Sequence, residues 1–281
     1  MRTTGRYKIG TLVLESFALD GGAMFGSIPK AIWNKLIPSD EKNRIPMVTR
    51  VLFIEGPNNK ILVDCGNGDK WSDKQRDIFE ILPQIKKPVR ELFGEIDTLI
   101  LTHLHFDHAA GSVYQDATGV LRLSFPNATH ILQSSNWERA NAPGVRERAS
   151  YLTDTVKELS AAKLELVEDG HQPFPGISLH RVDGHTRGLQ WILIEDELET
   201  VAYPSDLIPT AHHINLPFVM GYDLCAETTM HEKEQFLLKA SQNNWLVIFE
   251  HDYQTIGGRV RKEQDSKFIF VPEELGDLGL N

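Results

Sequence analysis

The chain has 281 residues, of which 41% are hydrophobic and 24% are charged, and its formal net charge is -10. This length and composition are typical of an ordered globular protein, and we expect a single domain over residues 1–281. The acidic balance argues against nucleic acid as a partner, because binding to a phosphate backbone draws on clustered Lys and Arg. No apolar run approaches the roughly 20 residues of a membrane span, and the N-terminus lacks the apolar core of a signal peptide, so we expect a cytoplasmic protein without a membrane partner.

Short apolar or alternating segments predict strands along most of the chain. The first strands are predicted at Lys8 to Leu19, Met47 to Glu55 and Lys60 to Val63, with the turn residues Gly56-Pro57-Asn58-Asn59 between the last two. Further strands are predicted at 98–101, 129–133, 164–167, 177–182, 190–194, 200–203, 245–250 and 267–271, and helices at 73–87, 146–162 and 226–242. Strands in groups with helices between them favour an α/β (α+β) fold, an αββα sandwich of two sheets covered by helices.

A cluster of possible metal ligands follows the strand predicted at 98–101. Its residues are Thr102-His103-Leu104-His105-Phe106-Asp107-His108. Two histidines one residue apart can converge on one ion from an extended segment, while the following Asp and His turn toward a second ion. Imidazole nitrogen and carboxylate oxygen suit Zn²⁺, and also Mn²⁺, Fe²⁺ or Co²⁺. The density of ligands directly after a buried strand favours a metal site over a polar surface loop.

The run His-Leu-His-Phe-Asp-His resembles the HxHxDH signature of the metallo-β-lactamase superfamily. Four further pieces of that family's pattern occur in the expected order, each after a predicted strand. They are Asp64-Cys65-Gly66, Gly184-His185-Thr186, Ser205-Asp206 and Glu250-His251-Asp252. The resemblance covers about Val48 to His251, and it implies the αββα sandwich of this superfamily.

The resemblance also implies two divalent metal ions, with zinc as the expected metal and cobalt, manganese or iron as alternatives. The first metal is assigned to His103, His105 and His185, the second to Asp107, His108 and His251, and the bridging position to Asp206. Asp64 is similar to the carboxylate that hydrogen-bonds a metal-bound histidine and fixes its tautomer.

Two cations at one site lower the pKa of a shared water, so a bridging hydroxide is expected near neutral pH as the nucleophile. One metal would polarise a carbonyl or phosphoryl oxygen, and Asp107 is the expected catalytic residue that moves the proton toward the leaving group. A non-catalytic metal-binding module is disfavoured, because a structural site tends toward four closed ligands.

Fold and metal set do not identify the substrate, because this superfamily hydrolyses lactams, thioesters, lactones, phosphodiesters and sulfates and includes redox enzymes. Asp206 argues against a true β-lactamase, since that group lacks a bridging carboxylate at this position. The complete ligand set without a flavin domain disfavours the redox branch. The lack of extra domains and of a basic surface disfavours a nuclease.

Two segments resemble quorum-quenching N-acyl homoserine lactonases: Leu19 to Lys30, and Leu207 to Pro217 after the bridging aspartate. The first is a Gly-rich loop with large apolar side chains. These are expected to line a groove for an acyl chain or to pack against a second subunit of a homodimer, with core packing as the alternative; they are Met24, Phe25, Ile28 and, slightly later, Trp33.

The chain departs from this branch at Pro209, where the best-known lactonases have a tyrosine that can bind the substrate carbonyl. His212 or His213 is expected to supply an equivalent donor as a catalytic residue, and Tyr222 is a further substrate-binding candidate. A structural role for one of the two histidines is the alternative. We therefore expect ring opening of N-acyl homoserine lactones, a small-molecule substrate, while a phosphotriesterase or arylesterase resembling methyl parathion hydrolase stays as the alternative.

Overall fold

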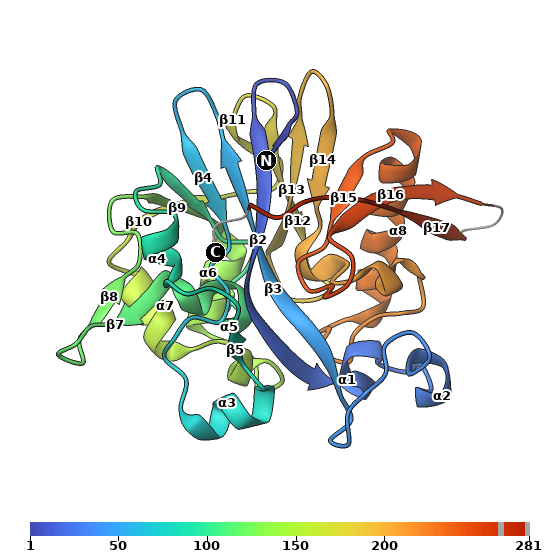
Figure 1. The fold of residues 1–281 in the computed structure, drawn as a ribbon, viewed down its shortest axis with the longest axis horizontal. Helices are drawn as coiled ribbons and strands as arrows, with labels where there is room; N and C mark the ends of the chain where they lie inside the picture. Colours follow the sequence, from blue (N-terminus) through green and yellow to red (C-terminus); the bar gives the residue numbers. More distant parts are fainter. Residues whose placement is uncertain (264–266, 279–281) are drawn as a thin grey trace.

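The computed structural model of the chain describes residues 1–263 and 267–278. Two large sheets pack face to face, and helices cover their outer faces (Figure 1). In this view the N-terminal half of the chain, blue to green, lies mainly on the left, and the orange and red C-terminal part lies on the right. The arrangement is a mixed α/β sandwich, and the predicted fold class is confirmed.

In the described residues the first sheet has eight strands, in the order β1-β2-β3-β4-β6-β9-β10, with β5 paired to β2. Their bounds are β1 (Arg2–Thr3), β2 (Lys8–Asp20), β3 (Arg44–Glu55), β4 (Lys60–Val63), β5 (Leu82–Pro83), β6 (Thr98–Ile100), β9 (Thr129–Gln133) and β10 (Lys163–Val167). The strands β4, β6, β9 and β10 run parallel. Their carboxyl ends therefore meet at one edge of the sheet, where ligand-binding loops of α/β proteins begin.

The second sheet has seven strands among the described residues, and their order in the sheet, from β11 to β17, is their order along the chain. They are β11 (His171–Phe174), β12 (Ile177–Val182), β13 (Leu189–Glu195), β14 (Thr200–Tyr203), β15 (Leu246–Ile248), β16 (Gly257–Lys262) and β17 (Phe268–Glu273). The strands β14 and β15 are parallel neighbours, so the segments that follow them emerge side by side. A separate hairpin consists of β7 (Val113–Gln115) and β8 (Leu121–Leu123).

The helices pack outside the two sheets and around one end of the sandwich. Four of them contribute to the apolar cluster on the outer face of the first sheet: α4 (Val89–Leu92), α5 (Phe106–Ala109), α6 (Ser134–Asn141) and α7 (Thr153–Leu159). The long helix α8 (Ala226–Gln242) packs against the outer face of the second sheet. The remaining elements are α1 (Gly21–Phe25), α2 (Lys30–Trp33), α3 (Asp73–Phe79) and the 3-10 turns η1 (Ala110–Ser112), η2 (Arg148–Ser150), η3 (Ser205–Leu207) and η4 (Ala211–Ile214).

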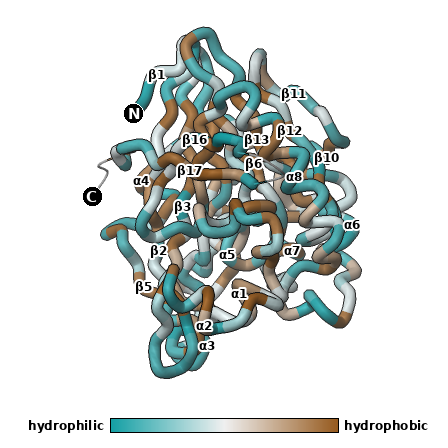
Figure 2. Tube along the Cα trace, turned by 90° about the vertical axis from the view of Figure 1, so that its right-hand side faces the viewer, coloured by the Kyte–Doolittle hydropathy of each residue, from teal (hydrophilic) through white to brown (hydrophobic). Residues whose placement is uncertain are grey.

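Alternation of side chains along each strand builds the layers. In β4, Ile61 and Val63 lie between the two sheets, whereas Leu62 faces the helices. In β13, Ile192 lies between the sheets and Leu193 packs on the side of α8. Each such burial is worth about 1.5–3 kcal/mol relative to exposure. Figure 2 shows the result, with brown hydrophobic segments along the inner strands and hydrophilic teal on many outer loops.

The predicted strands 60–63, 129–133, 177–182 and 200–203 and the predicted helix 226–242 have the bounds seen in the structure. Two predicted helices are too long. Glu80 ends α3 with a left-handed φ of 50°, and the next residues pair with β2 instead of continuing the helix predicted to 87. The helix predicted from 146 begins only at Thr153, because Tyr151 and Leu152 have extended backbone between η2 and α7.

None of the helices in the described ranges combines the length and apolarity that crossing a membrane requires.

Candidate metal centre

Loops at the carboxyl ends of strands from both sheets carry the predicted metal ligands. The segment after β6 supplies four of them, and the segments after β12, β14 and β15 supply one each. The structure brings all seven together in one buried cluster: His103, His105, Asp107, His108, His185, Asp206 and His251. Side chains that lie far apart in the sequence meet because the two sheets present the same edge to this end of the sandwich.

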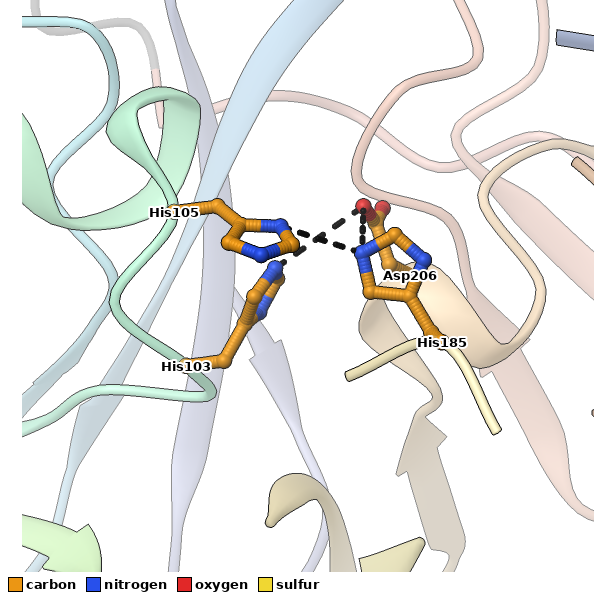
Figure 3. Close-up of side chains that lie close together, drawn as sticks. All are labelled: His103, His105, His185 and Asp206. Atoms are coloured by element: carbon orange, nitrogen blue, oxygen red, sulfur yellow. Dashed lines mark hydrogen bonds and ion pairs between the residues drawn. The ribbon is translucent and has the colours of Figure 1, made fainter. Parts of the chain in front are cut away.

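The first group consists of His103, His105, His185 and Asp206, whose ligand atoms all lie within 4.8 Å of one another (Figure 3). His185 Nε2 lies 3.2 Å from Asp206 Oδ2 and 3.2 Å from His105 Nδ1. His103 Nε2 lies 3.9 Å from the same Asp206 oxygen. Three imidazoles and a carboxylate thus point at one small volume.

The second group consists of Asp107, His108 and His251. The Nε2 atoms of the two histidines are 3.2 Å apart, and each lies 3.8 Å from a carboxylate oxygen of Asp107. Asp206 reaches this group too, with Oδ1 at 3.0 Å from His251 Nε2 and Oδ2 at 3.5 Å from His108 Nε2. Its carboxylate therefore lies between the two groups, as expected of a bridging ligand.

The chemistry of this donor set fits divalent cations. In the described part of the chain, His103 Nε2 is buried without a hydrogen-bond partner, a costly arrangement unless a ligand satisfies it. Burial lowers the pKa of His103 and of His105, which keeps their imidazoles neutral and able to coordinate. Burial also acts to lower the pKa of His251, but the carboxylates of Asp206 and Glu250 outweigh it and raise that pKa to about 9. The carboxylates around His251 therefore favour positive charge at this position, and a divalent cation can supply it.

Asp64 lies where the sequence predicts a carboxylate that supports a histidine. Its Oδ2 is 3.2 Å from His108 Nδ1 and accepts a hydrogen bond of 2.7 Å from Thr102 Oγ1. Its Oδ1 accepts a 2.8 Å bond from Thr102 N. The backbone of Asp64 is in the left-handed region, with φ of 60°, so the turn after β4 is bent specifically to place this side chain.

Two supporting carboxylates are absent from the sequence prediction. Asp223 Oδ1 lies 2.9 Å from His185 Nδ1, and Glu250 Oε1 lies 3.0 Å from His108 Nδ1. In the sequence, Glu250 directly precedes His251, and Asp223 directly follows Tyr222. A single acidic residue does not reveal which imidazole it will face in the folded chain, so these positions alone do not predict the contacts. Together with Asp64 they fix the orientation of metal-ligand candidates.

The two groups open onto a cleft of about 320 Å³. Its apolar lining residues are Leu19, Met24, Met47, Phe79, Phe106, Ala149 and Met220. Its polar lining residues, besides the cluster itself, are Arg146, Glu147, Ser150 and Tyr222. The cleft therefore offers an apolar wall opposite a charged centre, which suits a substrate with one apolar and one polar end.

The predicted groove residues occupy different places. Met24, Phe25 and Trp33 are all buried in one apolar cluster, at 1%, 0% and 1% exposed. Of the three, only Met24 contributes to the lining of the cleft. Phe25 stacks on the Trp33 ring at 5.7 Å and on the His213 ring at 4.9 Å. Ile28 packs against the same cluster. The positions of Phe25, Ile28 and Trp33 thus support the alternative interpretation, core packing.

The three candidates for a hydrogen-bond donor to the substrate, His212, His213 and Tyr222, lie in different surroundings. His213 is buried, with Nδ1 at 2.8 Å from Thr210 Oγ1 and Nε2 at 2.9 Å from Met24 O, and burial lowers its pKa to about 3. His212 is half-buried, and neither histidine lines the cleft. The contacts of His213 support the alternative interpretation, a structural role for one of the two histidines. Tyr222 lines the cleft.

Replacing Phe25 with alanine is expected to lower the free energy of unfolding by about 3–5 kcal/mol, because the change removes a fully buried ring and leaves a cavity. Urea unfolding of the variant measures this loss. KM for short and long acyl lactones should change by the same factor. Unchanged stability together with a KM increase confined to long chains would restore Phe25 as a groove residue.

A profile described as the metallo-beta-lactamase superfamily matches residues 44–251. That span is more than half of the chain, so the chain belongs to the metallo-β-lactamase superfamily. The buried histidine and aspartate cluster lies within or at the end of the matched span, as the resemblance in the sequence implied.

An N-acyl homoserine lactonase of Bacillus cereus is 31% identical over 159 residues, which are 56% of this chain and 56% of that protein. The match thus spans about half the length of the curated relative. The crystal structure of a probable metal-dependent hydrolase from Staphylococcus aureus is 28% identical, with a TM-score of 0.83 over 98% of this chain and 100% of that chain. AidC, a dizinc quorum-quenching lactonase in complex with a product, has the same fold at 17% identity, with a TM-score of 0.77 over 98% of this chain and 97% of that chain.

Proposed function

We propose that this protein is a dinuclear metal-dependent hydrolase that opens the lactone ring of N-acyl homoserine lactones, a quorum-quenching activity. The observation that carries the proposal is the two-part ligand cluster opening onto a cleft with an apolar wall. A relative 31% identical over part of the chain is named an N-acyl homoserine lactonase, which supports this substrate class.

The two groups of side chains would hold one divalent cation each, with Asp206 shared between them: His103, His105 and His185 for one, Asp107, His108 and His251 for the other. When bound, the cations, of which zinc is the expected kind, would lower the pKa of a shared water and polarise the substrate carbonyl.

The cleft residues have distinct roles in this reaction. Asp107 lines the cleft, and its carboxylate would accept the proton of the attacking water and pass it to the ring oxygen, which leaves as an alcohol. Burial, together with Asp20 and Asp107, raises the pKa of Tyr222 to about 12. Its hydroxyl therefore keeps its proton at neutral pH and can donate a hydrogen bond to the substrate carbonyl oxygen.

The apolar wall would hold the acyl chain. Met24 and Met220 are flexible thioether side chains that adapt to an alkyl chain, and Phe106 adds a flat surface directly beside Asp107. The same wall favours a second candidate function, hydrolysis of aryl esters or phosphotriesters, because the Phe79 and Phe106 rings lie 5.4 Å apart and could receive an aromatic leaving group.

Proton release by zinc- or cobalt-loaded protein from short-chain and long-chain N-acyl homoserine lactones tests the proposal, with aryl esters and phosphotriesters run in parallel. Fast lactone turnover that disappears with a chelator is the expected result. Slow lactone turnover beside rapid cleavage of esters or phosphotriesters would replace the lactonase by the second candidate. Chelator-insensitive turnover of every substrate would refute the metal centre.

Replacing Tyr222 with phenylalanine is expected to lower kcat/KM for lactones roughly tenfold, the value of one hydrogen bond of about 1.4 kcal/mol. The ring is kept, so the cleft keeps its shape. The same change at Tyr114, which lies outside this cleft, is the matched control and should leave kcat/KM unchanged. Equal kcat/KM for the Tyr222 variant and the native protein would exclude the hydroxyl as a donor.

The proposal also includes a single domain and a homodimer located in the cytoplasm. Ile32 and Leu36, which are 50% and 36% exposed, present apolar side chains at and just after α2, and this supports association of two copies. Light scattering on the purified protein measures its mass in solution. A monomer over the whole accessible concentration range would contradict the dimer.

A further inference from the structure

His105 faces the cluster differently from its neighbours. The Nδ1 atoms of His108, His185 and His251 contact Asp64, Asp223 and the Val48 carbonyl, while their Nε2 atoms face the other ligands. His105 presents Nδ1 to the cluster, at 3.2 Å from His185 Nε2. Its Nε2 is buried and has no hydrogen-bond partner in the described part of the chain.

The acidic side chain nearest that nitrogen is Glu147, a residue without an assigned role so far. Glu147 is 4% exposed, and its Oε2 lies 4.0 Å from His105 Nε2. The same oxygen accepts a hydrogen bond of 2.8 Å from Thr186 Oγ1, and the other carboxylate oxygen forms an ion pair with Arg139. The carboxylate is therefore held beside the imidazole by two further contacts.

Tyr151 closes the other side of the imidazole. Its ring packs edge-on against His105 with centroids 4.8 Å apart, and its hydroxyl lies 2.8 Å from Thr186 Oγ1. Because Thr186 directly follows His185, one hydroxyl links Glu147 and Tyr151 to the segment that carries another predicted ligand. His105 is thus surrounded by side chains that contact one another, as the other imidazoles of the cluster are.

A neutral imidazole that coordinates through Nδ1 must carry its proton on Nε2. That buried N–H needs an acceptor, and histidine ligands of metals commonly donate their second N–H to a carboxylate or carbonyl. A movement of about 1 Å would bring Glu147 within the 2.7–3.2 Å range of a hydrogen bond. Even at the present distance, the carboxylate favours the tautomer that points N–H toward it.

We propose that Glu147 is a positioning residue that holds His105 in the tautomer with Nδ1 free to bind metal. The inference rests on the proposed metal centre and adds a residue to it. Glu147 also lines the cleft, next to Arg146 in the sequence and close to Ala149 and Ser150. It therefore joins the wall formed by residues 146–150 to the first group of metal ligands.

Competition with a chelator for zinc measures the affinity of Glu147→Gln and Glu147→Ala without any substrate. We expect metal affinity to fall roughly 10- to 100-fold in both variants, as for other partners of metal-bound histidines. Arg139→Gln is the matched control, because it breaks the same ion pair but leaves the carboxylate beside His105. This control should lower Tm and reduce the affinity far less than the Glu147 variants do, because the hydrogen bond from Thr186 still holds the carboxylate.

Native affinity in Glu147→Gln, or an equal loss of affinity in Arg139→Gln, would overturn the proposal. Circular dichroism of the metal-free variants establishes that each is folded before its affinity is compared. His105→Ala separates this test from the metal centre itself: it should bind less zinc than the native protein. Retention of the full zinc content by that variant would refute the centre rather than the role of Glu147.

Discussion

Replacing Asp206 with alanine is expected to abolish metal binding and lactone hydrolysis together. Asp206 contacts imidazoles of both groups, His185 at 3.2 Å and His251 at 3.0 Å, so its removal would take a ligand from both proposed ions at once. Loss of a supporting partner alone costs roughly 10- to 100-fold in metal affinity or activity, and loss of a shared ligand should exceed that. Elemental analysis of the purified variant and its kcat/KM for an acyl lactone measure the two effects.

The control for this change is Asp77→Ala, because Asp77 has a side chain that is 78% exposed and pairs with Lys42 at the surface. Metal content and turnover of the control should equal those of the native protein. An Asp206→Ala variant that keeps both metals and near-native turnover would show that the carboxylate does not bridge, and the two-ion assignment would have to be abandoned.

Replacing Asp107 with asparagine is expected to lower kcat by roughly 10²- to 10⁴-fold, the usual contribution of a positioned acid or base. The amide oxygen can still occupy the ligand position, so metal content should fall far less than kcat. KM should change little, because the apolar wall of the cleft is untouched. Single-turnover kinetics at saturating metal, with metal content measured on the same sample, separate the two contributions.

A different pattern would assign Asp107 another role. If turnover in Asp107→Asn falls only in proportion to metal content and returns when excess zinc is added, Asp107 is a ligand and does not move the proton. Asp69→Asn provides a comparison for the same chemical change at a carboxylate outside the cleft, and its kcat should match the native value.

The sequence predicts well those elements whose apolar residues follow directly from the faces that they bury. Ile61, Leu62 and Val63 form a continuous apolar run, because β4 is covered on both faces. Helix α8 has a long amphipathic repeat. The predicted end of the helix at 73–87 was wrong for a local reason, since the helix itself begins at Asp73 as predicted. Glu80 takes a left-handed conformation that glycine normally takes, so composition does not mark the helix end.

In the candidate site, too, some residues can be predicted from sequence motifs and others cannot. The ligands are close in sequence or follow strands in short motifs, and the structure assembles all of them. Glu147 is a single acidic residue in a segment expected to be helical, and its relation to His105 exists only after the chain has folded. Met24 and Phe25 are adjacent at the end of α1 and both are buried, yet only Met24 contributes to the lining of the cleft. Residue type alone does not separate them, because both are large and apolar.

The order of the ligands along the chain has a consequence for biosynthesis. The first sheet contributes residues 103 to 108, whereas Asp206 and His251 follow the second sheet's β14 and β15. No fragment that ends before His251 contains the second group of ligands. Because domains fold as their residues leave the ribosome, an emerging chain contains the imidazoles that follow β6 long before Asp206 can contact His251. The complete two-ion centre that we propose can therefore form only after β15 and His251 have been translated and the two sheets have docked.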